Sequence, residues 1–122
     1  MIQVKNVNKS FDDKTILHSV DATFYDGKTN LIIGQSGSGK TVLMKSIVGL
    51  VTPEEGEILY DGRDLLQMDS KQKKELRKEI GMLFQGSALF DSETVLGNVM
   101  FPLVMFTNMT QAEMRDRALF CI

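Results

Sequence analysis

The sequence "GQSGSGKT" at residues 34–41 holds three glycines, two serines, a lysine and a threonine among its eight residues. It fits the pattern of a glycine, four variable residues, a glycine, a lysine and a hydroxyl residue that surrounds phosphate groups. Glycines let backbone N–H groups turn inward and form a nest for an anion, because no side chain blocks the approach. A lysine beside the nest neutralises phosphate charge, and the adjacent hydroxyl can ligate Mg²⁺. The loop therefore predicts a nucleotide-binding site.

Specific roles follow for the residues of this loop. Lys40 is expected to neutralise the terminal phosphates, and the Thr41 hydroxyl is expected to ligate Mg²⁺. Contacts to the phosphates are also expected from five further positions of the loop: Gly34, Ser36, Gly37, Ser38 and Gly39. The alternative is a Gly/Ser-rich surface loop, but the regular elements on both sides favour phosphate binding.

Two patterned elements flank the loop and would hold it in place. The nearly all-apolar residues 29–34 predict a short strand that is buried on both faces. From Gly39 onward the apolar residues follow a helical spacing, and Gly49 with Pro53 mark the end of that helix. The helix would aim its positive N-terminal end at the bound phosphates.

Strands and helices alternate along the remainder of the chain, which predicts an α/β fold. Strands are expected at residues 2–7, 15–28, 56–62 and 80–85, and Asp-Gly turn signals lie in the second and third of these stretches. Helices are expected at residues 71–79 with Ser70 as the cap, at residues 94–106 with a break at Pro102, and after a capping box that begins at Thr110.

The composition is that of an ordinary soluble domain, since 43% of the 122 residues are hydrophobic and 25% are charged. The formal net charge of −2 gives no general attraction to nucleic acid, so no nucleic-acid partner is expected. The single cysteine, Cys121, excludes an internal disulfide and fits a reducing compartment. The first residues lack a signal-peptide pattern, and the longest late apolar run, residues 99–106, falls short of the roughly 20 residues that span a bilayer. These features predict a cytosolic, single-domain protein.

Two longer stretches carry a resemblance to a known family. Residues 8–65 resemble the ATP-binding subunits of ABC transporters along their whole length, and residues 81–103 extend the match through that family's glutamine-containing loop at Gln85. The resemblance covers residues 2–122. The string "LFQGSALFDSETV" at residues 83–95 is most similar to ATPases of bacterial phospholipid, organic-solvent-resistance and mammalian-cell-entry-associated transport systems.

This resemblance implies an α/β P-loop NTPase fold of the ABC type, with ATP or ADP and Mg²⁺ as ligands. Residues 1–33 would form an antiparallel β region at the N-terminus, and residues 34–50 the phosphate loop and its helix. Residues 51–85 would add strands and a charged helix up to the glutamine loop, and residues 86–122 would begin a truncated helical subdomain.

Three residues gain a role only through the resemblance. Phe11 occupies the position of the aromatic ring that stacks on adenine, although a phenylalanine packed under the sheet is the alternative. Gln85 resembles the residue that contacts Mg²⁺ or the attacking water, so it joins Lys40 as a catalytic candidate and Thr41 as a metal candidate; an ordinary surface glutamine is the alternative. Many family members carry a hydroxyl residue at the position of Val42, whose backbone N–H can still meet a phosphate.

Several parts of the family's catalytic machinery are absent from this sequence. It contains no "SGGQ" signature, no apolar strand ending in Asp-Glu and no histidine after the phosphate loop. The segment "EILYDG" looks like a Walker B strand, but Gly62 after Asp61 favours an antiparallel strand with a tight turn. The chain is therefore expected to be the N-terminal half of a nucleotide-binding domain, which binds ATP but does not hydrolyse it alone.

By resemblance, the parent protein would couple ATP binding and hydrolysis to transport, with lipid as the expected cargo. Its partners would be membrane permease subunits and a second ATP-binding subunit, and it would lie in the cytoplasm against the inner face of the membrane. One alternative is a non-catalytic fragment that self-associates through the open edge of residues 29–34. A P-loop kinase or GTPase is disfavoured, because no guanine-binding motif or lid-type arginine cluster is found.

The remaining features of the sequence are less specific. His18 has no histidine or cysteine partner, which favours a solvated strand face over a metal site. The basic residues 71–78 could meet anionic lipid, but Glu75 and Glu79 favour a solvated helix face. The eight methionines could fill the core or form an adaptable docking surface.

Overall fold

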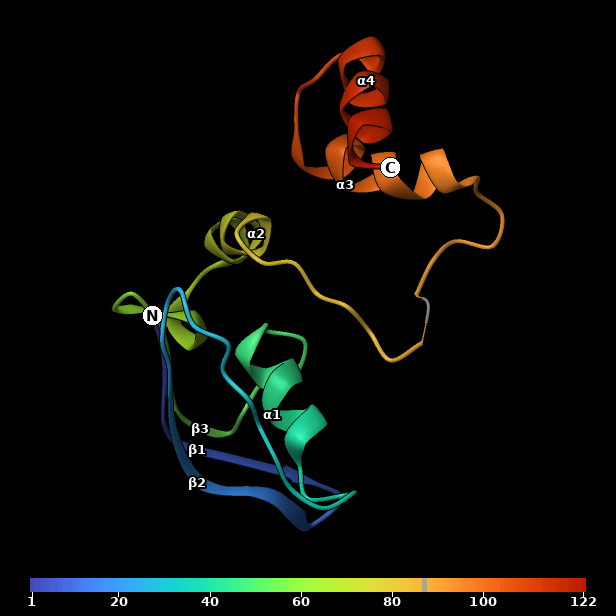
Figure 1. The fold of residues 1–122 in the computed structure, drawn as a ribbon. Coiled ribbons are helices and arrows are strands. Elements are labelled where there is room, and N and C mark those ends of the chain that lie inside the picture. The colour runs from blue at the N-terminus through green and yellow to red at the C-terminus, as the bar shows by residue number, and fades with distance from the viewer. Residues whose placement is uncertain (87) are drawn as a thin grey trace. The chain divides into compact units, whose positions relative to one another are not determined.

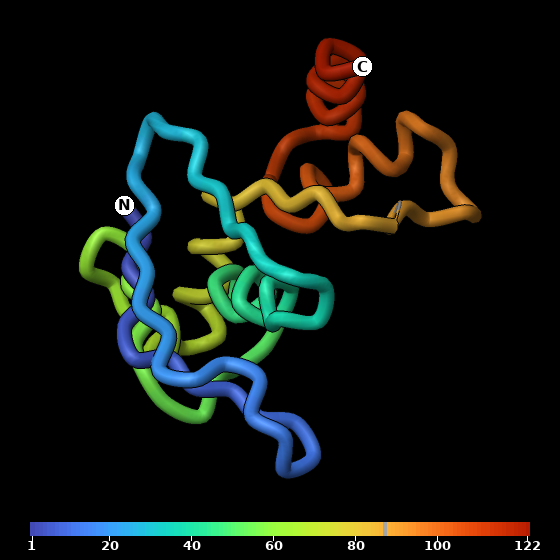
Figure 2. Tube along the Cα trace, turned by 60° about the horizontal axis from the view of Figure 1, so that its bottom comes forward, coloured from blue at the N-terminus to red at the C-terminus, as the bar shows by residue number. Residues whose placement is uncertain are grey.

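A long antiparallel hairpin forms the N-terminal part of the computed structural model. β1 (Ile2–Phe11) pairs with β2 (Lys14–Phe24), and the turn residues Asp12 and Asp13 have φ angles of 46° and 64°. Aspartate tolerates this left-handed conformation, and a two-residue turn of this kind matches the twist of the strands that it joins. In Figure 2 the hairpin is the blue part of the tube, which begins at the N-terminus.

Two further strands complete a four-stranded antiparallel sheet in the order β2-β1-β3-β4. β3 (Glu55–Tyr60) pairs with β1, and the short β4 (Arg63–Asp64) pairs with β3. Asp61 and Gly62 form the turn between β3 and β4, with φ angles of 48° and 83°. This arrangement confirms the predicted strand and tight turn at "EILYDG" and the antiparallel β region at the N-terminus.

Helix α1 (Lys40–Ile47) packs against this sheet and directly follows the glycine-rich loop. Its buried residues are Leu43, Ser46 and Ile47, at the spacing expected of one helical face. A 3₁₀ helix (Leu65–Gln67) and α2 (Ser70–Lys78) follow β4 and add further residues to the same core. The buried residues of this hydrophobic core are Val4, Val7, Leu17, Leu43, Ile47, Ile58, Tyr60, Leu65 and Leu76.

The structure describes residues 1–86 and 88–122, which divide into two units, Met1–Ile80 and Gly81–Ile122 (Figure 1). The second unit contains α3 (Val95–Phe106) and α4 (Gln111–Cys121), whose buried residues are Met114 and Ala118 on α4. Thr110 and Glu113 form the capping box that the sequence predicts for the last helix. Among the described helices, none is long and apolar enough to cross a bilayer.

Two strands expected from the sequence are not formed. Residues 29–34 have no strand pairing, and the side chains of Leu31 and Ile33 are each 81% exposed. Residues 80–85 also lack strand structure, and Leu83 is 97% exposed. A strand exists only where a neighbour accepts and donates its backbone hydrogen bonds, and no described segment pairs with either stretch. The apolar pattern of each stretch was therefore insufficient to predict a strand.

Two helix details also differ from the expectations. α3 continues through Pro102 without the predicted break. The proline lacks a backbone N–H and so removes a single hydrogen bond of the helix. Other hydrogen bonds of the helix persist, such as the one from the Thr107 N–H to the Leu103 carbonyl at 3.0 Å. The cap of α2 is Asp69 and not Ser70. The Asp69 carboxylate accepts from the Gln72 N–H at 2.8 Å, and the Gln72 side chain accepts from the Asp69 N–H at 2.9 Å.

Candidate nucleotide-binding site

The glycine-rich loop has the backbone geometry that an anion site requires. Gly37 and Gly39 have φ angles of 79° and 98°, which only glycine adopts at little cost. α1 begins directly after Gly39, and no side chain caps its first N–H groups. These amides and the positive end of the helix can therefore serve a bound anion.

The side chain of Lys40 folds back over the same loop. Its Nζ donates to the carbonyl oxygens of Gly34 at 2.8 Å and Gln35 at 2.6 Å, and lies 3.5 Å from Ser38 Oγ. The carbonyls of Gly34 and Gln35 thus hold the Lys40 ammonium close to the loop that leads into α1. Because these contacts are exposed to solvent, phosphate oxygens can exchange for the carbonyls as partners of the ammonium.

Gly39 also fixes the loop to the sheet. A Cβ atom on this residue would lie 3.2 Å from the carbonyl oxygen and Cγ2 of Ile16 and 3.2 Å from Cδ2 of Leu17. Since both neighbours belong to β2, the end of the loop packs closely against that strand. The glycine is therefore needed twice, for its left-handed backbone and for the narrow space beside β2.

Thr41 and Val42, in the first turn of α1, differ in their exposure to solvent. Thr41 is exposed, so its hydroxyl is accessible to a ligand. Val42 is half-buried and packs against the hydrophobic core. The Val42 side chain therefore contributes to the core, and only its N–H remains for contact with a phosphate.

Tyr60 anchors the far end of α1, a role that the sequence analysis missed. The buried hydroxyl donates to the carbonyl oxygen of Ile47 at 2.7 Å, which satisfies one of the terminal carbonyls of the helix. Burial raises the pKa of Tyr60 to about 12. The alternating apolar pattern of β3 could have indicated burial of this tyrosine, but no sequence signal identifies its partner.

Tyr60→Phe is expected to lower the free energy of unfolding by about 1–3 kcal/mol, because the Ile47 carbonyl would lose its buried donor. The raised pKa means that the folded state favours the neutral phenol, so this contribution is complete below pH 10 and is lost as the pH rises toward 12. Urea unfolding at pH 7 and pH 11 would measure both effects. Tyr25→Phe is the control, since Tyr25 is 60% exposed; an equal change in the two variants would contradict the assignment.

Phe11 lies at the end of β1 with its ring 45% exposed, so it is not packed under the sheet. Lys9, two residues earlier, pairs across the hairpin with Leu17, and Leu17 in turn lies against Gly39. The strand end that carries Phe11 is therefore adjacent to the strand that supports the phosphate loop. This places an exposed aromatic ring in the same unit as the loop.

Gln85 is exposed in a segment without helix or strand and belongs to the second unit. Its contact with Mg²⁺ or with the attacking water remains a prediction. The described residues contain no group of three or more His, Cys, Asp or Glu residues positioned to hold a metal ion. His18 is exposed on β2.

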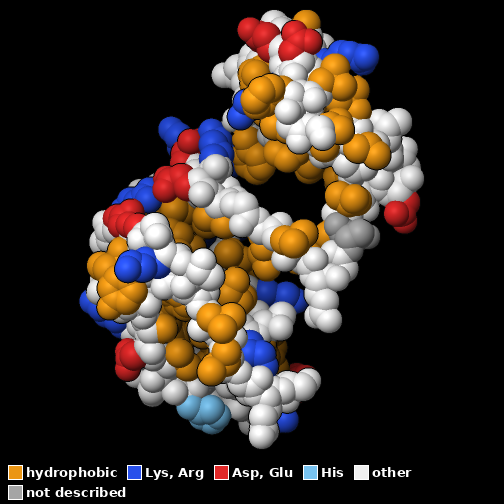
Figure 3. Space-filling view, in the orientation of Figure 1, with side chains coloured by type: hydrophobic (Ala, Val, Ile, Leu, Met, Phe, Trp, Pro, Cys, Tyr) orange, Lys and Arg blue, Asp and Glu red, His pale blue; other side chains and the backbone are white. Residues whose placement is uncertain are grey.

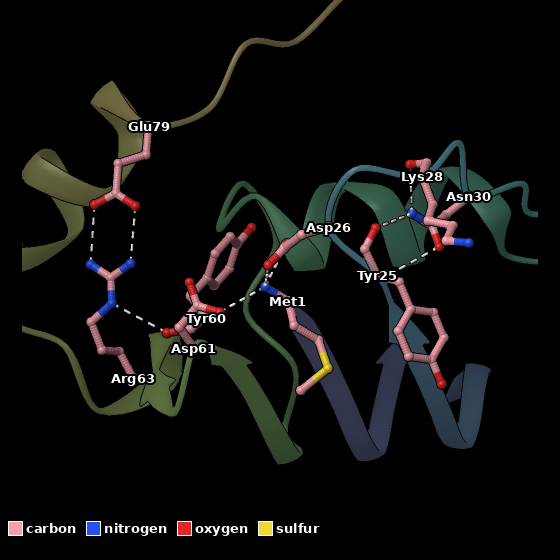
Figure 4. Close-up of polar contacts among 9 residues, drawn as sticks. All are labelled: Met1, Tyr25, Asp26, Lys28, Asn30, Tyr60, Asp61, Arg63 and Glu79. Carbon is pink, nitrogen blue, oxygen red and sulfur yellow. Dashed lines mark hydrogen bonds and ion pairs between the residues drawn. The ribbon is translucent and has the colours of Figure 1, made fainter.

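Polar contacts fix the turns that precede the loop and follow β3 (Figure 4). The Asn30 side chain accepts from the Tyr25 N–H at 3.1 Å and donates to the Tyr25 carbonyl at 3.0 Å, which closes the turn before the loop segment. Asp61 accepts from the Met1 amino group at 2.7 Å. The carboxylate that resembled a Walker B residue in the sequence therefore belongs to a surface turn.

Comparison with known proteins shows which family this chain is similar to. The family profile described as "ABC transporter" matches residues 17–120. The chain is 40% identical, over 94% of its length and 33% of the relative's, to a probable ribonucleotide transport ATP-binding protein of Mycobacterium leprae. It is 39% identical, over 95% of its length and 44% of the relative's, to the intermembrane phospholipid transport system ATP-binding protein of Haemophilus influenzae.

A solved structure shows the same fold. It is a dimeric ATP-binding cassette in a post-hydrolysis state, bound to ADP and inorganic phosphate. The match has a TM-score of 0.87 and 33% identity, and covers 99% of this chain and 55% of that one. The chain thus spans a third to about half of the length of these relatives.

Proposed function

Because this chain belongs to the ABC transporter family of ATP-binding proteins, we propose that it binds ATP between the loop at residues 34–41 and the ring of Phe11. The observation that supports this most directly is the loop itself. Its glycines at positive φ, the uncapped start of α1 and the Lys40 ammonium all converge on one exposed turn. A triphosphate would bind there, and adenine would stack on the exposed aromatic ring.

The loop also fits a magnesium ion bound together with the nucleotide. Mg²⁺ is usually held by one or two protein oxygens and by substrate phosphates, and it keeps several waters. The exposed Thr41 hydroxyl, one residue after the phosphate-binding lysine, can supply such a protein oxygen. Gln85 is proposed as a further contact to the ion or to the attacking water, since it holds the matching position in the family's glutamine loop. Bound Mg²⁺ would neutralise charge on the β- and γ-phosphates.

For the whole protein we propose that ATP binding and hydrolysis drive transport through permease subunits, with a second ATP-binding subunit as partner. The dimeric state of the ADP-bound structural relative supports such a pairing. The protein would then lie in the cytoplasm on the inner face of the membrane. Residues 1–122 alone lack a general-base glutamate after an apolar strand and a later histidine, so we propose that they bind ATP without turning it over.

Lipid is the cargo that we propose. The Haemophilus influenzae relative belongs to an intermembrane phospholipid transport system, and its match includes the segment around Gln85, whose sequence resembles this subgroup. The Mycobacterium leprae relative, of similar identity, is described as a probable ribonucleotide transport ATP-binding protein. Within residues 1–122, lipid is therefore favoured as the cargo only by the stretch of sequence around Gln85.

Phe11→Ala is expected to weaken ATP binding by about 1–3 kcal/mol, the usual contribution of a base stacked on an aromatic ring. Binding of inorganic triphosphate should be unchanged, because it has no base to stack. Competition of each ligand with a fluorescent ATP analogue would measure the two affinities, with Phe120→Ala on α4 as a control that removes another exposed ring. Equal losses for ATP and triphosphate would point instead to a folding role for Phe11.

A second candidate is self-association of residues 1–122 without an ATP-dependent role. Its support is the exposure of Leu31 and Ile33 in a segment without strand pairing, together with hydrophobic side chains on the surface of α3 and α4 (Figure 3). Large exposed apolar areas and unpaired edges favour association. Specific ATP binding that depends on the phosphate loop distinguishes the first proposal from this one.

A further inference from the structure

We propose that Lys9, held in place by Glu54, fixes the ring of Phe11 in the orientation that stacks on adenine. The proposal rests on the function proposed above and adds a pair of positioning residues to it. Neither residue belongs to the phosphate loop, and neither needs to touch the nucleotide.

The ammonium of Lys9 lies between an aromatic ring and a carboxylate. Its Nζ is 4.9 Å from the centroid of the Phe11 ring and 2.5 Å from Oε1 of Glu54. The Lys9 side chain is only 14% exposed, whereas the ring keeps an exposed area for a ligand. A cation over a ring is attracted to its π face, so the ammonium restrains the ring from one side.

Glu54 is itself fixed to the end of β1 by its other contacts. Its Oε2 accepts from the Ser10 N–H at 3.0 Å, and its own N–H donates to the Asn8 carbonyl at 3.0 Å. Hydrogen bonds from Lys9 and Ser10 hold the pKa of the Glu54 carboxyl below its usual range. The carboxylate therefore places the ammonium at a defined point beside the ring.

The contacts of Glu54 connect the strand that carries Phe11 with the segment that follows α1. Glu54 ends the segment that joins α1, which follows the phosphate loop, to β3. Its bonds to residues 8–10 tie this segment to the strand that carries Phe11. A ring held in one orientation before binding loses less conformational freedom when adenine stacks on it, which increases affinity.

The test compares Lys9→Met, Lys9→Arg and Lys5→Met in the full-length protein, with ATP and inorganic triphosphate as ligands. Lys9→Met keeps an apolar stem but removes the cation, and should weaken ATP about 2- to 5-fold while leaving triphosphate affinity unchanged. Lys9→Arg should restore ATP affinity, because a guanidinium can occupy the same place over the ring. Lys5 is exposed on the same strand, across from Glu57, so Lys5→Met controls for the lost charge.

The outcomes separate this inference from the function on which it rests. Selective loss of ATP affinity in Lys9→Met, with rescue by arginine, supports the positioning role. An unchanged ratio of ATP to triphosphate affinity in Lys9→Met, while Phe11→Ala still lowers it, would overturn the inference and leave adenine stacking intact. If Phe11→Ala leaves that ratio unchanged, the stacking proposal fails and the role of Lys9 fails with it. Equal losses for both ligands in Lys9→Met would show a structural ion pair only.

Discussion

Lys40→Ala is expected to raise the dissociation constant for ATP about 100-fold, equivalent to roughly 2.7 kcal/mol. The substitution removes the ammonium that the loop holds against the Gly34 and Gln35 carbonyls, and with it charge-assisted hydrogen bonds worth about 1.5–3 kcal/mol each. Inorganic triphosphate should lose affinity to the same extent, because the lost contacts involve phosphate alone. Titration with a fluorescent ATP analogue would measure the effect.

A matched control for this experiment lies on the same helix. Lys45→Ala removes an equal charge from the last turn of α1 and should change ATP affinity less than about twofold, because the phosphate loop joins the other end of the helix. The wild-type contacts of Lys40 are exposed, so its loss should leave the folded state largely intact. Equal ATP affinity in wild type and Lys40→Ala would refute the phosphate-binding assignment of the loop.

Features that depend on short-range chemistry could be predicted from the sequence. The Asp61-Gly62 turn, the capping box at Thr110 and the helix that begins after Gly39 all occur as expected. Each follows from the conformational preference or hydrogen bonding of residues within one turn of each other. The ABC-type α/β fold is confirmed as well, by a close structural relative.

Features that depend on a distant partner could not be predicted in this way. Residues 29–34 have the apolar pattern of a buried strand, yet strand structure requires a paired neighbour that the described residues do not provide. The hydrogen bond from Tyr60 to Ile47 and the ion pair of Lys9 with Glu54 join residues that are 13 and 45 positions apart. No local pattern in the sequence identifies such partners.

Within the candidate site, the sequence located the phosphate loop but not the contacts that support it. The pattern of glycines and Lys40 is local, and the structure gives it the expected turn and helix start. The packing of Gly39 against Ile16 and Leu17 arises only when β2 folds beneath the loop. Gln85 belongs to the other unit, so the geometry of the phosphate loop does not test its predicted contact with Mg²⁺ or the attacking water.

Gly56→Ala is expected to have the largest effect on stability, lowering the free energy of unfolding by about 3 kcal/mol or more. Gly56 has a φ of 103°, and a Cβ atom would lie 2.6 Å from the carbonyl oxygens of Lys5 and Asn6 and 2.7 Å from the Cα of Val7. These atoms are backbone of the central strand β1, so they cannot move aside without disturbing the sheet. A left-handed backbone costs a non-glycine residue about 1–2 kcal/mol, and overpacking adds about 1–3 kcal/mol.

Displacement of β1 at this point would also disturb the core, because Val7 and Ile58 are fully buried on the paired strands. Gly62→Ala is the matched control: Gly62 has a φ of 83°, but a Cβ there would meet no atom within 4 Å, so only the backbone cost of about 1–2 kcal/mol applies. Urea unfolding of the two variants would separate steric conflict from backbone strain. If Gly56→Ala is no less stable than Gly62→Ala, the close approach of β3 to residues 5–7 of β1 does not limit the residue at position 56, and the proposed steric cause is wrong.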